Sequence, residues 1–392
     1  MSRIAAVIVS LFALAVGISG AQAQDTVKVG LILPYSGQFA DAGIQIENGL
    51  KLYMSQHGDT VAGKKIEIIR KDVGGIAPDV AKRLAQELIV RDGVDMIAGF
   101  ALTPNALAAG DVSAQAKKFM VVMNAATSII TTKSPYMVRT SLTIPQLEEA
   151  FGEWVAKNGT KTVYTMVSDY GPGHDAEQAF IRGYTKGGGK IVGSVRMPIA
   201  NPDFSAFVQR AKDVSPEGIF IFVPGGAQPA ALGKAMAERG IDPSNTKIMG
   251  QGEITMEKGL ESLGDSALGI VTTFHYDVSH DSDLNRAFVK DYKAMFDRNP
   301  DLFSAGGYDG AHLIYEALKK TNGNTDAQAL VDAAKGMAWE SPRGPVSIDP
   351  ETRDIIQTVY VREVQKVDGV LTNVEIAKIE NVKDPVKEAM KK

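Results

Sequence analysis

The sequence contains no cysteine among its 392 residues. This absence excludes disulfide bonds, a thiol nucleophile and a cysteine-ligated metal site. Histidine is also scarce, and the spacing of the five histidines matches no H-E-x-x-H or other metal-binding motif. We therefore expect a protein that holds neither a metal ion nor a cofactor.

Signatures of common catalytic sites are missing as well. The chain has no G-x-S-x-G turn, no Walker loop and no dinucleotide fingerprint. Asp169 and His174 stand close together in the sequence and resemble a proton relay, but residues beside a helix N-terminus more often cap the helix. An enzyme is accordingly the least favoured class of function, and no catalytic residue is assigned.

Neither an excess of positive charge nor a long apolar run occurs in the body of the chain. The 42 basic and 46 acidic residues give a net charge of −4, so nucleic acid and anionic membranes are not expected partners. At the start, Arg3 precedes an apolar stretch over residues 4–18, and A-Q-A stands at residues 21–23. This pattern is typical of a cleavable signal peptide, here residues 1–23. Without a cysteine there to carry a lipid anchor, the mature chain is expected in the periplasm of a Gram-negative bacterium.

An apolar, β-branched segment at Val27–Leu33 predicts a strand that is buried on both faces. A turn that contains Ser36 follows, and a helical pattern begins near Ala42. Free backbone N–H groups and a hydroxyl at this edge of a sheet favour an anion-binding site. An ordinary connection between a strand and a helix explains the segment equally well.

Strands and helices alternate along the chain in two series. Strands are predicted at Val27–Leu33, Lys64–Lys71, Val94–Ala98, Phe119–Met123, Thr162–Val167, Lys190–Met197, Gly218–Val223 and Thr246–Met249. Alternation of this kind predicts an α/β protein with two doubly wound parallel-sheet lobes. The chain is also longer than one hydrophobic core normally serves.

The expected borders of the two lobes follow from where the second series begins and where the tail returns. Lobe I is predicted at residues 24–142 and 273–345, and lobe II at residues 143–272 and 346–380, with a C-terminal tail at 381–392. The tail is predicted to complete both lobes rather than to form a third domain. Three crossing segments, near Arg139–Pro145, Thr272–Tyr276 and Gly344–Pro350, would then form a hinge.

The loops at the predicted strand ends are rich in small, hydroxylated and aromatic residues. Small side chains let backbone N–H groups approach a carboxylate, and hydroxyls add hydrogen-bond donors. The aromatic residues beside them are Phe39, Phe100, Tyr170, Tyr276 and Tyr308. Such a mixture suits a ligand with one anionic end and one apolar body, although each aromatic taken alone is more often a packing residue.

Five motifs in order carry a resemblance to a known family. They are V-K-V-G-L-I-L-P-Y-S-G-Q-F from Val27, N-A-A-T-S from Asn124, D-Y-G-P-G from Asp169, G-Y-D-G-A from Gly307, and P-R-G-P-V-S-I-D-P from Pro342. The chain resembles the substrate-binding proteins of branched-chain amino acid type ABC transporters, which are similar to leucine/isoleucine/valine-binding proteins and share the type I periplasmic binding fold. The resemblance extends over essentially the whole mature chain.

The resemblance implies a set of ligand-binding residues. In the family, amide groups and a hydroxyl of the A-A-T element hold the ligand's carboxylate together with a Ser or Thr from the preceding strand end. These positions correspond here to Ala125, Ala126, Thr127 and Thr103. The tyrosine that reaches in from the second lobe corresponds to Tyr170.

Two departures from the family pattern concern the ligand's ammonium group. Ala227 stands where amino-acid binders carry an aromatic residue, and Gly252 stands where they carry an acid, with Glu253 one residue further on. Without that acid, the expected ligand is an aromatic or other hydrophobic organic acid. If Glu253 points inward, a hydrophobic or branched-chain amino acid becomes the better candidate.

His275 and Tyr276 lie at a predicted crossing segment and are further candidates for polar contacts, although a histidine there is more often a hinge or surface residue. The resemblance implies a monomer that closes on a small carboxylate and delivers it to ABC permease subunits in the inner membrane. A periplasmic sensor that signals to a receptor is the alternative, and the sequence does not separate the two.

Overall fold

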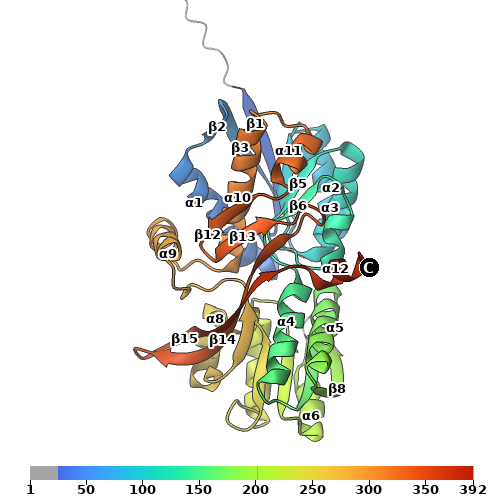
Figure 1. Cartoon of the computed structure of the whole chain (residues 1–392), viewed down its shortest axis with the longest axis vertical. Coiled ribbons are helices and arrows are strands. Elements are labelled where there is room, and N and C mark those ends of the chain that lie inside the picture. The colour runs from blue at the N-terminus through green and yellow to red at the C-terminus, as the bar shows by residue number, and fades with distance from the viewer. Residues whose placement is uncertain (1–24, 201, 392) are drawn as a thin grey trace, which may run out of the picture.

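The computed structural model describes residues 25–200 and 202–391. The expected signal peptide, residues 1–23, lies outside the described residues. Figure 1 shows two lobes arranged along the long axis of the molecule, with α1–α3 in the upper lobe and α4–α6 in the lower lobe. Among the described residues, no helix combines the length and the apolar character that crossing a membrane requires.

Lobe I is built on a six-stranded sheet in the order β2-β3-β1-β4-β5-β6. Its strands are β1 (Thr26–Leu33), β2 (Thr60–Val61), β3 (Lys64–Asp72), β4 (Met96–Gly99), β5 (Phe119–Val122) and β6 (Met137–Arg139). β1 lies in the middle, with parallel neighbours on both sides, and residues 29–33 of it are buried. The prediction of a strand buried on both faces at Val27–Leu33 is therefore confirmed.

Helices cover both faces of this sheet. They are α1 (Ala40–His57), α2 (Pro78–Val90), α3 (Thr103–Ala116), α9 (Asp283–Phe296), α10 (Leu302–Lys320) and α11 (Ala327–Ala334), with a short 3-10 helix η1 (Gly37–Phe39) before α1. α1 and α10 approach closely because glycine stands at their contact: a Cβ on Gly49 would lie 1.9 Å from the carbonyl oxygen of Ser304. The C-terminal part of the chain thus returns to lobe I.

The second sheet has nine strands in the order β12-β13-β14-β11-β10-β9-β7-β8, with β15 paired to β14. Most of this sheet forms lobe II, whereas β12 and β13 lie beside α10 of lobe I (Figure 1). The strands are β7 (Thr162–Ser168), β8 (Lys190–Met197), β9 (Gly218–Phe222), β10 (Lys247–Gln251), β11 (Val271–Phe274), β12 (Ala338–Ser341), β13 (Gly344–Ile348), β14 (Ile355–Val367) and β15 (Val370–Val382). The helices are α4 (Ile144–Lys157), α5 (Gly171–Lys186), α6 (Ser205–Val214), α7 (Gln228–Glu238), α8 (Glu257–Leu263) and α12 (Pro385–Met390), with short 3-10 helices η3 (Gly252–Thr255) and η4 (Gly264–Ala267). A further 3-10 helix, η2 (Ser128–Thr132), lies between β5 and β6 of lobe I.

The two-lobed α/β architecture agrees with the prediction, but the C-terminal strands do not follow the parallel pattern. β14 pairs antiparallel with β11, β13 and β15, so the second sheet is mixed. The expected borders after residues 272, 345 and 380 fall inside β11, β13 and β15. Each of these strands is continuous, so the changes between lobes take place in the connections beside them. β14 runs from the level of the hinge into the lower lobe (Figure 1).

Arg343 ties three segments of the hinge together. Its guanidinium lies 2.8 Å from the Asp309 carboxylate in α10 and donates to the carbonyl oxygen of Ser141 (2.6 Å) and to Oε1 of Gln357 (2.6 Å). Arg343 and Asp309 are both fully buried. Because a buried charge without a partner is costly, this network fixes how the crossing segments lie against lobe I.

Candidate ligand-binding site

A cleft of about 1470 Å³ lies between the two lobes. Lobe I contributes Phe39, Thr103, Ala126 and other residues to its lining, and lobe II contributes Tyr170, Phe222, Gly225, Ala227 and Glu253. Pockets that enclose a small ligand usually have volumes of about 300–1,000 Å³. The cleft therefore has more than enough room for a ligand of that size.

Two hydroxyls stand together on the lobe I wall of the cleft. Thr103 begins α3 directly after β4, and Thr127 ends the loop that follows β5. The hydroxyl of Thr127 donates to that of Thr103 over 3.1 Å, and both residues are buried. The side-chain amide of Asn124 donates to the carbonyl oxygen of Ala101 (2.8 Å), which joins the two loops. Thr103 and Ala126 line the cleft, and Thr127 lies directly behind Thr103.

Ala125 and Phe100 support this wall from behind. The backbone N–H of Ala125 donates to the carbonyl oxygen of Phe100 over 2.9 Å, so this amide is engaged within lobe I. Phe100 is 1% exposed and packs with Ile32 and Val122 in the core between the sheet and its helices. Both residues lie outside the cleft lining, although the sequence analysis predicted that they contact the ligand.

The predicted anion site after β1 is only partly in the cleft. Phe39 lines the cleft, but Ser36 is exposed and hydrogen-bonds to Asp72 instead. The turn is fixed by this contact because Asp72 also accepts from the backbone N–H of Tyr35 (2.8 Å). The hydroxyl of Ser36 is therefore directed to a neighbouring turn of lobe I.

The N-terminus of α5 brings lobe II against the lobe I wall. A Cβ on Gly171, the first residue of α5, would lie 3.3 Å from Oγ1 of Thr127. The backbone N–H of Ser128 donates to the carboxylate of Asp175 in α5 over 3.0 Å. Tyr170, which precedes α5, lines the cleft. The loop 124–128 is thus contacted from both lobes.

Glu253 supplies an acidic group on the lobe II wall. It follows β10 within η3, its carboxylate accepts a hydrogen bond from the backbone N–H of Gly225, and its own N–H donates to Oε1 of Gln251 (2.8 Å). Burial raises the pKa of Glu253 to about 7, and the negative charge of Asp301 acts in the same direction. Burial also raises the pKa of Tyr170, as does the nearby charge of Glu253. Glu253 therefore faces the cleft beside Tyr170, and Ala227 stands exposed on the same wall.

A second acidic group lies where α10 begins. Burial raises the pKa of Asp301 to about 6, and the side-chain amide of Gln45 donates to its carboxylate over 2.7 Å. Nearby, Arg298 forms an ion pair with Asp41 at 2.7 Å. The positive charge of Arg298 is thus already compensated, and the cleft surface formed by Glu253 and Asp301 is acidic.

His275 and Tyr276 have different positions at the crossing that follows β11. His275 is fully buried outside the cleft lining, and neither ring nitrogen has a hydrogen-bond partner among the described residues. Burial lowers the pKa of His275, and the charges of Arg343 and Arg362 lower it further. Tyr276 lines the cleft, but its hydroxyl donates to Oδ1 of Asn285 over 3.1 Å. Tyr276 therefore presents its ring rather than a free hydroxyl.

Several lining residues were not found from the sequence. They include Gln38, Asp41, Asn124, Phe222, Phe274, Arg298, Asp301 and Arg362. Phe222 could have been predicted from the sequence, because it ends a strand at the edge of the sheet where ligands bind. Phe274 likewise ends β11, and Gln38 and Asn124 stand in two of the five motifs, although no role was assigned to them. No motif or spacing marks Asp41, Arg298, Asp301 or Arg362. Among the described residues, no three histidine or acidic side chains cluster as a metal site would require.

Comparisons with known proteins agree with this two-lobed architecture. Residues 26–369 match the family model described as periplasmic binding protein. A Leu/Ile/Val-binding protein homolog 6 from Brucella melitensis is 45% identical over 388 residues, which cover 98% of this chain and 99% of that protein.

Two crystal structures from Rhodopseudomonas palustris are similar in both sequence and fold. A solute-binding protein of an ABC transporter from strain BisB5, in complex with 3,4-dihydroxy benzoic acid, is 54% identical with a TM-score of 0.89, and the match covers 93% of this chain and 100% of that one. Another from strain HaA2, in complex with p-hydroxybenzoic acid, is 43% identical with a TM-score of 0.89 and coverage of 92% and 99%. The prediction from the five sequence motifs is confirmed: the chain belongs to the periplasmic binding protein family and is a solute-binding protein of the ABC-transporter type.

Proposed function

We propose that this protein captures a small aromatic carboxylate that carries a ring hydroxyl, and delivers it to the permease of an ABC importer. The observation that carries this proposal is the chemical difference between the two walls of the cleft. Lobe I presents the hydroxyl of Thr103, to which the hydroxyl of Thr127 donates, whereas lobe II presents the carboxyl group of Glu253. A ligand with different groups at its two ends fits such a cleft in one orientation.

The ligand's carboxylate is assigned to the lobe I wall. Hydroxyls there can donate to an anion, the small side chain of Ala126 leaves its backbone accessible, and the N-termini of α3 and α5 add favourable partial charges. On the opposite wall, Glu253 repels a carboxylate when it is ionised. Both effects favour the same orientation.

The ring and its hydroxyl are assigned to the remaining lining. Phe39, Tyr170, Phe222 and Tyr276 provide aromatic surface for a flat apolar body. Glu253 has no basic residue among the causes of its pKa shift, so its carboxyl group is suited to accept a hydrogen bond from a neutral hydroxyl. The two relatives bound to hydroxylated benzoic acids support this choice of ligand class.

A hydrophobic or branched-chain amino acid is the second candidate, and the position of Glu253 favours it. A carboxylate in the cleft is also a partner for an ammonium group, and a cationic partner would offset the cost of ionising Glu253 there. The similarity to a Leu/Ile/Val-binding protein homolog points the same way. The exposed Ala227 leaves this wall without the aromatic residue that amino-acid binders carry.

Calorimetric titration separates the two candidates. The panel contains benzoate, 4-hydroxybenzoate, 3,4-dihydroxybenzoate, leucine, isoleucine and valine. We expect the hydroxybenzoates to bind most tightly and to raise the melting temperature, because a ligand at 100 times its Kd stabilises the folded state by about 2.7 kcal/mol. Tight binding of the amino acids with no binding of the benzoates would assign the cleft to the second candidate.

Delivery to a permease follows from closure of the lobes on the ligand. A ligand that contacts both lobes binds the closed form more tightly and so increases its population, and a permease recognises that form. A sensor would use the same closure to signal to a receptor. Uptake of labelled 4-hydroxybenzoate by cells with and without the gene distinguishes the two, since only an importer component is required for uptake.

A further inference from the structure

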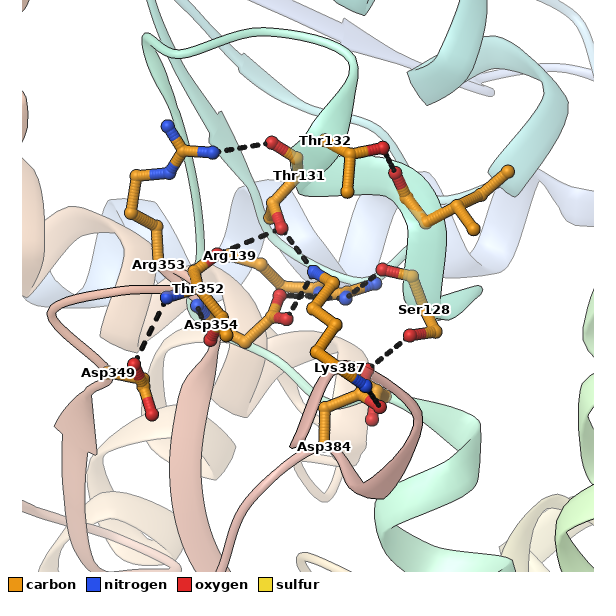
Figure 2. Close-up of polar contacts among 12 residues, drawn as sticks. Ser128, Thr131, Thr132, Arg139, Asp349, Thr352, Arg353, Asp354, Asp384 and Lys387 are labelled. Carbon is orange, nitrogen blue, oxygen red and sulfur yellow. Dashed lines mark hydrogen bonds and ion pairs between the residues drawn. The ribbon is translucent and has the colours of Figure 1, made fainter. Parts of the chain in front are cut away.

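We propose that Arg139, Asp354 and Lys387 are positioning residues for the ligand site, and that the C-terminal helix α12 acts through them as a latch on loop 125–128. This role presupposes the carboxylate site proposed above on the lobe I wall. Figure 2 shows the three side chains gathered between loop 128–132, the turn before β14 and the start of α12. These segments lie far apart in the sequence.

Arg139 holds the loop through its carbonyl oxygens. Nη1 donates to the carbonyl oxygens of Ala125 (3.1 Å) and Thr127 (2.8 Å), and Nη2 donates to that of Ser128 (3.4 Å). In a trans peptide group the C=O and the next N–H point in opposite directions. Anchoring the Ala125 carbonyl therefore directs the N–H of Ala126, a cleft-lining residue, away from Arg139.

Asp354 fixes the guanidinium of Arg139. Its Oδ1 accepts from Nε (3.0 Å) and Nη2 (2.7 Å) of Arg139, and both side chains are essentially fully buried. This two-pronged contact sets the plane of the guanidinium, so the orientation of the donors to loop 125–128 depends on it. Asp354 lies just before β14, the strand that joins the hinge to lobe II.

The second carboxylate oxygen of Asp354 is occupied by the C-terminal segment. Nζ of Lys387 in α12 lies 2.5 Å from Oδ2 of Asp354 and also donates to the hydroxyl of Thr131. Lys387 is 6% exposed, so its charge is removed from water and compensated by this contact. One turn earlier, Asp384 accepts from the hydroxyl of Ser128 over 2.6 Å. The segment predicted as a simple tail is thus docked on the loop that adjoins the cleft.

The same loop is also contacted by α5 of lobe II. Movement of α12 can therefore change how lobe II approaches lobe I. Ser128 donates through its backbone to Asp175 of α5 and through its hydroxyl to Asp384 before α12. α5 begins at Gly171, the residue that abuts Thr127. Displacing α12 would break the hydrogen bond between Ser128 and Asp384 and would remove Lys387, one of the two cations that contact Asp354. We infer that loop 125–128 would then lose its fixed shape, although every residue that touches the ligand would remain.

The test compares a substitution in α12 with one at the residue that directly follows it. Lys387→Met removes the buried charge, whereas Lys391→Met removes an exposed lysine that forms ion pairs with Glu351 and Glu388. We expect Lys387→Met to weaken 4-hydroxybenzoate binding at least about fivefold, measured by calorimetry well below the melting temperature of each variant. Lys391→Met should bind as wild type does. A residue that serves stability alone would lower the melting temperature and leave this Kd unchanged.

Hydrogen exchange of the ligand-free proteins gives a second readout that does not need a ligand. Amides of residues 124–132 should exchange faster in Lys387→Met than in Lys391→Met. In wild type, ligand should slow exchange in residues 385–390, because coupling between two sites is reciprocal.

If wild type binds no carboxylate, the proposed function fails, and the exchange of residues 124–132 alone decides whether α12 acts as a latch. Unchanged exchange and an unchanged Kd in Lys387→Met would overturn the latch and leave the proposed function standing. Should Lys387→Met fail to fold, slowed exchange of 385–390 on adding ligand to wild type supports the latch, and its absence overturns it.

Discussion

The hydroxyl of Thr127 donates a hydrogen bond to the hydroxyl of Thr103 over 3.1 Å on the lobe I wall of the cleft. The two residues come from different loops, so this hydrogen bond also joins the segments that follow β4 and β5. Thr127 uses its proton in this bond, which leaves the proton of Thr103 available to a ligand carboxylate.

Thr103→Val should therefore weaken binding of hydroxybenzoates without abolishing folding. A hydrogen bond to a charged group contributes about 1.5–3 kcal/mol, so we expect a loss of about 10- to 100-fold in affinity by calorimetry. Ser36→Ala is the matched control, since it removes a hydroxyl that lies outside the cleft lining. Equal losses in both variants would show that the effect is not specific to the cleft.

Gly171→Ala should separate affinity from stability. The added Cβ would lie 3.3 Å from Oγ1 of Thr127, so the start of α5 must move back from the lobe I wall. Alanine is a better helix former than glycine, which offsets part of the cost of moving the start of α5, so the stability of the ligand-free protein should change by less than about 1 kcal/mol. Affinity for the ligand should fall several-fold. Gln178→Ala, at an exposed position of the same helix, should change neither quantity. An unchanged Kd in Gly171→Ala would contradict the contact between α5 and Thr127.

Much of the fold could be predicted because its central strands are short apolar runs between turns. β1, β4, β5, β7 and β9 are buried nearly throughout, and each was found from the sequence. β15 was missed because most of its residues are exposed or half-buried, including Val370 at 64% exposure, so its apolar residues do not mark a buried face. Its pairing with β14 depends on a hairpin turn rather than on burial.

The site could be predicted only where it follows strand ends. Thr103 begins α3, Ala126 lies in the loop after β5, Tyr170 precedes α5 and Glu253 follows β10, and all four line the cleft. Spacing does not reveal contacts between remote segments, such as that of Ser128 with Asp384, 256 residues away. Nor does it give the direction of a side chain, which is why buried residues such as Phe100 and His275 were counted among the ligand contacts.

The raised pKa of Glu253 makes a prediction about the pH dependence of stability. Burial raises this pKa from 4.5 to about 7, so the folded state favours the protonated form. The resulting stabilisation is fully present below about pH 4.5 and is lost as the pH rises to about 7. Glu253→Gln keeps an acceptor for the N–H of Gly225 but does not ionise.

The free energy of unfolding in urea should be measured for both proteins from pH 5 to pH 8. The advantage of Glu253→Gln over wild type should grow across this range, by about 1–3 kcal/mol. Asp301 titrates in both proteins, so the part of its contribution that does not depend on Glu253 cancels in the difference, and the part that comes from its coupling to Glu253 remains. A difference that stays constant with pH would show that Glu253 is not held in a buried environment.

The last prediction concerns the buried ion pair of Arg343 and Asp309 at the hinge. Arg343→Met leaves the Asp309 carboxylate buried with only the hydrogen bonds from Trp339 and Ser341, each 2.9 Å. Removing one partner of such a pair costs about 3–5 kcal/mol, which should appear as a lower urea midpoint. Lys157→Met breaks an exposed pair with Glu153 and should cost at most about 1 kcal/mol.

A second substitution tests whether the cost comes from the orphaned charge. Adding Asp309→Asn to Arg343→Met removes that charge, so the double variant should recover part of the lost stability. Its ligand affinity should remain below that of wild type, because Arg343 also holds the carbonyl oxygen of Ser141 in the crossing segment that leads from loop 125–128 to lobe II. Full recovery of both stability and affinity would mean that this crossing needs no cation, and that closure does not depend on how Arg343 holds the hinge.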